Sequence, residues 1–402
     1  MKTLALLGLL LTLFASPVFA APSKIFGAAG DASIPPTPPC QVFGFSVENI
    51  VTLPVGQNQA AMVRVDRSGL TQIGYILTSQ ATGYTVHAFN FKTLASLGDS
   101  VQTPLGYRNA GRLQGDVGSD GFLYLFYEVL TADPLCPSNN CVVMAKWNGA
   151  SLVSAVTDSN TGATSNIDDA RESGGQFLAG ISLASGIRVF RLYDKGSLTR
   201  LSTGTDTGVS VFLHVSRALG SSDIYGALSD NTTFPNIFRF AIGTATASGS
   251  TSLAYTAGLG ISAIFPQEGA SLMILDSGNE TTPQRAYVTP PTTIAGPQGF
   301  PSTSANLGAA FQGSFYDSTN RKVFSLRTNA GSAGLLLRST VGLTDTFASE
   351  ERFPCASCVN AGGTTTGSQV VDYAQSFARM YVGSNESPAR LTQLKVCAVG
   401  GP

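Results

Sequence analysis

The stretch Leu123-Tyr124-Leu125-Phe126 decides the fold, because a stretch of the same kind returns along the whole chain. Each copy is apolar, aromatic or β-branched and is bounded by turn-forming residues, which is typical of a short β-strand. The other copies begin at Gly74, Phe177, Ile224, Leu272, Val323 and Met380. The interval between copies is about fifty residues, and self-similarity at such a period predicts a repeat architecture.

Each repeat contains three further strand signals around the aligned stretch. In the second repeat the third strand covers residues 142–147, and a tight Asn148-Gly149 turn leads to the fourth. A single four-stranded unit has apolar side chains on both faces, so it must pack against a neighbour on each side. We therefore predict an all-β fold, a seven-bladed β-propeller of four-stranded antiparallel blades. A pair of β-sandwiches is the competing fold, and the recurring turn between third and fourth strands favours the propeller.

The last repeat is one strand short, and this predicts how the ring closes. Its third strand covers residues 391–398, after which the chain ends, whereas residues 41–47 form a spare strand before the first repeat. We expect this N-terminal strand to join the last blade. Cys40 and Cys397 would then lie on neighbouring strands, within reach of a disulfide. The alternative is a disulfide that pins two loose ends.

The first forty residues predict export. Lys2 precedes an apolar run at residues 4–14, and small residues precede a cleavage site after Ala20, as in a secretory signal. We assign residues 1–20 to a signal peptide, 21–40 to a disordered arm rich in Pro and Ala, and 41–402 to the propeller. A membrane anchor at residues 4–14 is the alternative, but the run is short. The predicted localisation is secreted, or extracellular.

Six cysteines in a secreted chain predict three disulfides. Cys136 with Cys141 and Cys355 with Cys358 would each close a short loop. A zinc site is disfavoured, since the chain has only two histidines. Glycosylation sequons are a further extracellular sign, although chance placement in polar loops is the alternative. The three acceptor residues are Asn231, Asn279 and Asn385.

Charge and motifs exclude several functions. The formal net charge is −1 and 12% of residues are charged, which argues against nucleic acid and against an anionic membrane as partners. No later segment is apolar for long enough to predict membrane insertion. The nucleophile motif Gly-x-Ser-x-Gly does not occur. His87 and His214 are predicted to be structural, and we predict no catalytic residue.

A candidate axial site arises from three acidic residues. Asp66, Asp169 and Asp372 each lie nine residues before the second residue of an aligned stretch. The first strands of the blades line the channel of a propeller, so these carboxylates could converge there and hold Ca²⁺. The simpler interpretation, which we favour, gives each aspartate its usual hydrogen-bonding role in a turn; no cofactor is then needed. Nearby arginines are Arg64, Arg112, Arg171 and Arg217.

In repeat length and strand order the chain resembles the β-propeller superfamily over most of its length. The segment from Asp116 to Tyr124 looks like the turn before a strand in NHL-like propellers. The Trp-Asp ends of WD40 blades are absent, because Trp147 is the sole tryptophan. The acidic boxes of sialidases and the double glycines of kelch repeats are also missing. The resemblance therefore implies a fold and no particular subfamily.

The predicted function is a secreted extracellular binding or adhesion module that presents a rigid propeller surface to a protein or glycan partner. One alternative is a secreted hydrolase or lyase with an axial metal or carboxylate site. Another is an extracellular structural protein that assembles with itself through its weakly charged surface. The sequence leaves the ligand, the binding face and the oligomeric state open.

Overall fold

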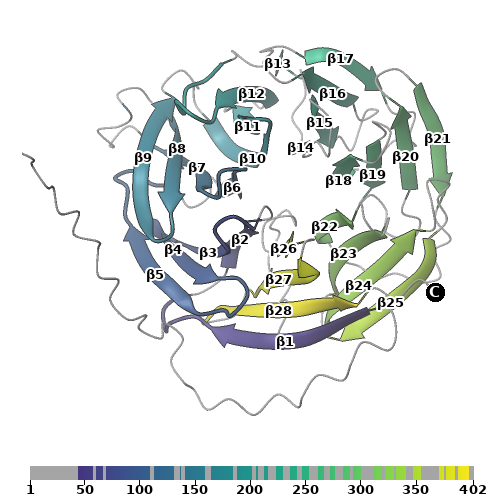
Figure 1. Cartoon of the computed structure of the whole chain (residues 1–402). Helices are drawn as coiled ribbons and strands as arrows, with labels where there is room; N and C mark the ends of the chain where they lie inside the picture. The colour runs from purple at the N-terminus through teal and green to yellow at the C-terminus, as the bar shows by residue number, and fades with distance from the viewer. Residues whose placement is uncertain are drawn as a thin grey trace, which may run out of the picture.

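Four-stranded antiparallel sheets make up the fold, and there are seven of them among the strands that the structure describes. The computed structural model describes residues 44–57, 60–66, 69–108, 113–130, 136, 141–158, 164–183, 188–201, 371–374, 377–384 and 388–397, and, between residues 205 and 354, the strands named below. The sheets stand around a common centre, with the first strand of each sheet innermost (Figure 1). In the described residues, no helix reaches the length and apolar character needed to cross a membrane.

The sheets follow one another along the chain. The first sheet contains β2 (Ala60–Val65), β3 (Ile73–Gln80), β4 (Gly83–Asn90) and β5 (Ser96–Gln102). The second contains β6 (Gln114–Val117), β7 (Leu123–Val129), β8 (Cys141–Asn148) and β9 (Ser151–Asp158). The third contains β10 (Thr164–Ser173), β11 (Gln176–Leu183), β12 (Arg188–Asp194) and β13 (Thr205–Asp206). The fourth contains β14 (Phe212–Val215), β15 (Asp223–Ser229), β16 (Asn236–Ala241) and β17 (Ala247–Ser252).

The remaining sheets complete the series. The fifth contains β18 (Ile261–Pro266), β19 (Leu272–Asp276), β20 (Gln284–Thr289) and β21 (Thr293–Gly299). The sixth contains β22 (Phe311–Asp317), β23 (Lys322–Asn329), β24 (Ser332–Thr340) and β25 (Phe347–Pro354). The seventh contains β26 (Val371–Ala374), β27 (Arg379–Gly383), β28 (Arg390–Cys397) and β1 (Gly44–Thr52).

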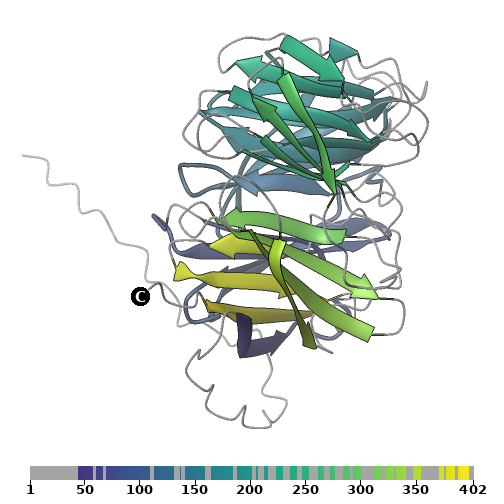
Figure 2. The same cartoon turned by 90° about the vertical axis from the view of Figure 1, so that its right-hand side faces the viewer.

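Strand β1 comes from the other end of the chain and lies beside β28 in both views (Figures 1 and 2). The two strands are antiparallel, with Gly44 opposite Cys397 and Thr52 opposite Arg390, and the register shifts between Val47 and Asn49. The predicted pairing of the N-terminal segment with the last strand is therefore present, and β1 runs further than predicted, to Thr52.

The inner strands are in contact from sheet to sheet. The first strand of each sheet contacts the first strand of the next, and β26 of the seventh sheet contacts β2 of the first. Strand β7 is buried at every position. Because successive side chains of a strand point to opposite faces, such a strand must be covered on both faces. The sequence correctly predicts this two-sided burial.

Strand β4 shows how one strand serves two interfaces. Val86 and Ala88 belong to an apolar cluster shared with the second sheet, whereas Phe89 belongs to a cluster shared with the seventh. A third cluster joins the second and third sheets. Outermost strands are different: Leu152 and Val153 of β9 are 44% and 53% exposed. Apolar burial between sheets is thus the main stabilising term in this part of the molecule.

The turns between third and fourth strands of the first and third sheets share one geometry. Leu94 donates its backbone N–H to the carbonyl of Asn90, and Leu198 donates to that of Asp194. Both leucines have positive φ, 56° and 59°, a conformation that costs an L-residue about 1–2 kcal/mol. Each side chain is buried, at 3% and 4% exposure, and this burial offsets the strain.

Replacement of the turn leucine tests this balance. We expect Leu94→Ala to lower the free energy of unfolding by about 2–4 kcal/mol, because it leaves a cavity at the interface with the seventh sheet while the backbone strain remains. Urea denaturation measures the change. Leu97→Ala is the control, since Leu97 is 47% exposed on β5 and its loss should cost less than about 0.5 kcal/mol. Equal effects would show that the turn leucine has no anchoring role.

One of the predicted disulfides lies in the described region. Cys136 and Cys141 are joined, with their Cα atoms 5.6 Å apart. Cys40, Cys355 and Cys358 lie outside the described residues, and of Cys397 only the backbone in β28 is described. The sequons at Asn231, Asn279 and Asn385 and residues 1–43 also lie outside.

Candidate functional site

The inner strands carry charged residues at one structural position. Opposite the second residue of the aligned stretch lie Arg64 in the first sheet, Asp116 in the second and Arg171 in the third. Asp372 holds the same position in the seventh sheet. Read around the centre from the seventh sheet to the third, the charges therefore alternate as minus, plus, minus, plus.

The structure separates the three aspartates that the sequence grouped. Only Asp372 occupies the alternating position; Asp169 precedes Arg171 on β10 and pairs with it at 3.1 Å. Asp66 lies in the turn after β2, where its carboxylate accepts hydrogen bonds from the N–H and hydroxyl of Thr71. A constant spacing of nine residues fails because the turns between first and second strands differ in length, so equal spacing does not give equal register.

Arg64 is the centre of the charged group and is fully buried. Its Nε donates to the carbonyl of Gly115 at 2.8 Å and lies 4.0 Å from Asp116. Burial, and next the charge of Arg171, lower the pKa of Arg64 to about 9, while Asp372, Asp116 and Asp169 raise it. The guanidinium is therefore still charged at neutral pH, held by carboxylates from neighbouring sheets.

The two alternating aspartates also tie sheet to sheet through the backbone. Asp372 accepts a hydrogen bond from the N–H of Val65 in the first sheet at 2.8 Å. Asp116 accepts one from the N–H of Glu172 in the third sheet at 3.3 Å. In each case the donor is the residue that follows the arginine of the next sheet. This repeated bond indicates that the axial charges hold neighbouring sheets together.

The axial group does not have the chemistry of a calcium site in the described part of the chain. Calcium prefers several oxygen ligands with excess negative charge, whereas Asp116 and Asp169 lie against Arg64 and Arg171. Among the described residues no three His, Cys, Asp or Glu side chains cluster as metal ligands would. Calcium binding remains a prediction from the sequence that no observation here supports.

A serine–lysine contact connects the second and third sheets, and it bears on the hydrolase alternative. Lys195 Nζ donates to Ser119 Oγ at 2.7 Å, and Ser119 donates to Glu172 at 3.0 Å. Lys195 Nζ also lies 3.4 Å from Glu172 and 3.9 Å from Asp120, so two carboxylates share this group with the serine. The contact is therefore an ion-pair network between turns.

His87 is buried and makes a contact within its own sheet. It is 1% exposed on β4, and its Nδ1 lies 2.8 Å from the carboxylate of Asp99 on β5. The pair joins the outer two strands of the first sheet. His214 lies on β14, where only the backbone is described.

The best candidate binding site is a pocket of about 510 Å³ between the seventh and first sheets. Its volume is in the usual range of small-ligand pockets. The lining side chains are mostly polar or aromatic and come from β1, β27, β28, the turn before β27 and the turn after β4: Glu48, Asn49, Lys92, Phe377, Arg379, Tyr381 and Gln393.

The floor of this pocket is rigid. Tyr381 and Gln393 are 0% and 1% exposed, and both donate hydrogen bonds to the carbonyl of Phe91, at 2.5 and 2.9 Å. Burial raises the pKa of Tyr381 to about 12, so its hydroxyl remains a donor at any physiological pH. Asn49 donates to the side-chain oxygen of Gln393 at 2.8 Å. The two bonds to Phe91 tie the seventh sheet to the turn of the first, and the bond from Asn49 joins β1 to β28 within the seventh sheet.

The mouth of the pocket carries the charges. Glu48 of β1 forms an ion pair with Arg379 of β27. Lys92 lies with its Nζ 4.7 Å from the centre of the Phe377 ring, a cation–π contact. Lys92 and Asn49 are exposed, so an approaching ligand meets an ammonium group, an amide and an ion pair above a buried floor.

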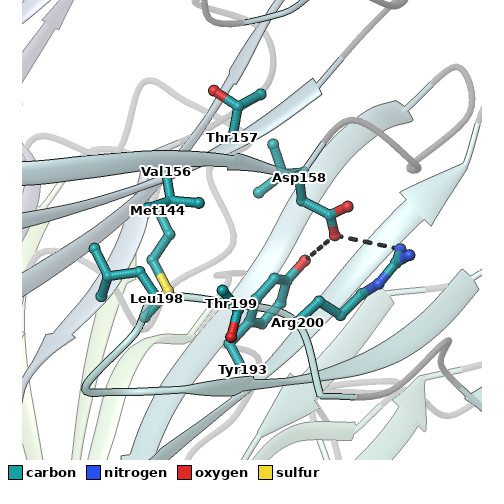
Figure 3. Close-up of a pocket in the computed structure, with 9 residues that line it drawn as sticks. Met144, Val156, Thr157, Asp158, Tyr193, Leu198, Thr199 and Arg200 are labelled. Carbon is teal, nitrogen blue, oxygen red and sulfur yellow. Dashed lines mark hydrogen bonds and ion pairs between the residues drawn. The ribbon is translucent and has the colours of Figure 1, made fainter.

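A smaller pocket of about 200 Å³ lies between the second and third sheets (Figure 3). Met144, Val156 and Leu198 form its apolar side. On the other side the hydroxyl of Tyr193 and the guanidinium of Arg200 reach the carboxylate of Asp158, at 3.0 and 3.3 Å (Figure 3). Arg191 donates to the same carboxylate oxygen. Both pockets thus lie between the outer strands of one sheet and the turn between the third and fourth strands of the next.

The sequence does not predict either pocket. Lys92 and Arg379 are separated by most of the chain and meet only because β1 and the seventh sheet pack against the first sheet. The one feature of the sequence that points to this part of the molecule is the predicted pairing of the N-terminal segment with the last strand, which brings the two ends of the chain together. It does not say which side chains meet there.

No family model matches the sequence, and no curated protein matches it either. Solved structures do match. A lectin from Burkholderia pseudomallei, BP39L, has a TM-score of 0.56 at 12% identity, with 86% of this chain and 99% of the lectin covered. The Dos1 propeller has a TM-score of 0.50 at 7% identity, with coverage of 84% and 78%. Raptor from Chaetomium thermophilum has a TM-score of 0.56 at 8% identity; the match covers 89% of this chain and 30% of Raptor.

These similarities, together with the four-stranded antiparallel sheets, define the class: the chain has a β-propeller fold. At such low identity the likeness concerns the fold alone, and function must be argued from the site.

Proposed function

We propose that the protein is a secreted seven-bladed β-propeller, closed by β1, that acts as an extracellular binding module for a glycan or protein partner. Each of the seven four-stranded sheets is then one blade. The contact of β26 with β2 and the pairing of β1 with β28 support closure by the N-terminal strand. Residues 1–20 support secretion.

The observation that carries the binding proposal is the pocket between the seventh and first blades. Its exposed amide and charged groups and the half-buried Phe377 ring, above a floor formed by Tyr381 and Gln393, are suited to a ligand with hydroxyl groups and an apolar face. A saccharide has this chemistry, so we favour the glycan over the protein partner. The lectin among the similar propellers supports the same choice, although its likeness concerns the fold.

A glycan array tests the proposal with the chain from residue 21. We expect the wild type to bind at least one glycan class, and Asn49→Trp to lose at least about tenfold in affinity because a large side chain fills the mouth; tenfold corresponds to about 1.4 kcal/mol. Ser154→Trp is the matched control, since it adds the same bulk at an exposed position of β9.

Two results would contradict the proposal. One is a wild-type protein that binds no glycan on the array. The other is binding that Asn49→Trp leaves unchanged, which would move the site away from the pocket. Unfolding curves of both variants establish that each is folded.

A further inference from the structure

We infer that this pocket takes an acidic saccharide unit, a pyranose that carries a carboxylate, with Lys92 as the group that binds the anion. The inference rests on the proposed function and specifies its ligand class.

The charge balance of the pocket is the first argument. Its ionised side chains are Glu48, Lys92 and Arg379. Glu48 is engaged by Arg379, and no carboxylate among the described residues contacts the Lys92 ammonium, which rests over the Phe377 ring. The pocket therefore has an excess positive charge, located at its exposed mouth. An anionic ligand supplies the missing partner.

The second pocket provides a contrast within the same molecule. There the protein itself supplies the carboxylate, that of Asp158. It accepts hydrogen bonds from Tyr193 and Arg191 and forms an ion pair with Arg200. In the pocket between the seventh and first blades, Glu48 is the one carboxylate among the described lining residues, and it pairs with Arg379 rather than with Lys92. A ligand carboxylate at Lys92 would supply the contact that no described carboxylate of the protein makes.

The remaining groups fit the rest of a sugar ring. Asn49 is exposed, and its amide makes one hydrogen bond, to Gln393, within the described residues. It therefore keeps an acceptor and a second N–H for ligand hydroxyls. The half-buried Phe377 ring, which packs on Phe91 with 5.0 Å between ring centres, supports the Lys92 ammonium at the mouth and so positions it for the ligand.

The test compares two ligands that differ only in the acid: methyl β-glucuronide and methyl β-glucoside, titrated by calorimetry into the chain from residue 21. We expect the glucuronide to bind at least about tenfold more tightly, because hydrogen bonds to charged groups contribute more than neutral ones. Lys92→Gln should abolish this difference and leave the glucoside affinity within about twofold. Added salt should weaken glucuronide binding alone.

Lys195→Gln is the matched control. It removes one positive charge from the corresponding turn of the third blade, where Lys195 pairs with Glu172 and Asp120 away from the pocket, so it changes the net charge equally and should leave glucuronide binding unchanged. Its unfolding curve is measured as well, because these ion pairs are lost. Because Lys92 is exposed, its replacement should not alter the unfolding curve, and a folded variant makes the comparison valid.

Failure of this inference differs from failure of the proposed function. Equal affinity for the two ligands, or a preference for the glucuronide that survives Lys92→Gln, would overturn the acidic-sugar site while glycan binding on the array still stood. Tight binding of glucose 6-sulfate without any preference for the glucuronide would also overturn it, since the anion would then be a sulfate. A protein that binds nothing on the array would overturn both.

Discussion

Replacement of Arg64 by methionine is expected to lower the free energy of unfolding by about 3–5 kcal/mol, the usual cost of removing one partner from a buried ion pair. Arg64 is 0% exposed and lies among Asp116, Asp372 and Asp169. Methionine matches its apolar stem but removes the positive charge that lies 4.0 Å from Asp116 and that interacts with Asp372, whereas Asp169 keeps its ion pair with Arg171. It also removes the hydrogen bonds to the carbonyls of Gly115 and Val63. Urea denaturation of the purified protein measures the change.

A control variant and a double variant test whether the lost stability comes from the ion pair between the sheets. Lys92→Met removes a charge from an exposed position in the turn after β4 and should cost less than about 0.5 kcal/mol. In Arg64→Met with Asp116→Asn, the loss should be smaller than the sum of the single losses, because one uncompensated charge is gone. Strict additivity, or a loss below about 1 kcal/mol for Arg64→Met, would show that the alternating axial charges do not join the sheets.

Deletion of β1 is expected to abolish cooperative folding. A chain that begins at Pro54 loses a whole strand of the seventh sheet, together with Val51 and Leu53, which pack in the cluster shared with the first sheet. It also leaves the edge of β28 unpaired, and an exposed edge of this kind promotes aggregation. We expect no urea transition and a rise in light scattering with concentration.

Two further chains isolate the cause. A chain that begins at Cys40 keeps β1 and lacks only the predicted disordered arm, so its unfolding curve should match that of the chain from residue 21. Addition of a synthetic peptide with residues 44–53 to the chain from Pro54 should restore part of the transition, because strand addition satisfies the open edge. A chain from Pro54 that unfolds cooperatively, with stability within about 1 kcal/mol of the longer chain, would contradict closure by β1.

The charged axial group shows where prediction from sequence reached its limit. The sequence shows three aspartates at a fixed spacing before the aligned stretch, Asp66, Asp169 and Asp372. Of these three, Asp372 alone lies opposite the second residue of that stretch, where the alternating axial charges are found. Arg64 and Arg171 lie at other spacings from the aligned stretch, so a constant spacing does not single them out, yet they occupy the same position in their own sheets. A turn longer or shorter by one residue moves a side chain to the other face of a strand, and the lengths of these turns vary.

What the sequence by itself determined is local and periodic: the strands, the repeat of four strands, the short Cys136–Cys141 disulfide, and the pairing of the N-terminal segment with the last strand. These features depend on alternation, turn residues and the count of strands, all of which can be read along the chain. Only the tertiary structure decided the alternating axial charges and the pocket that contains Lys92 and Arg379. Both join residues from different sheets, and their distances depend on bulges, turn lengths and packing that no local pattern encodes.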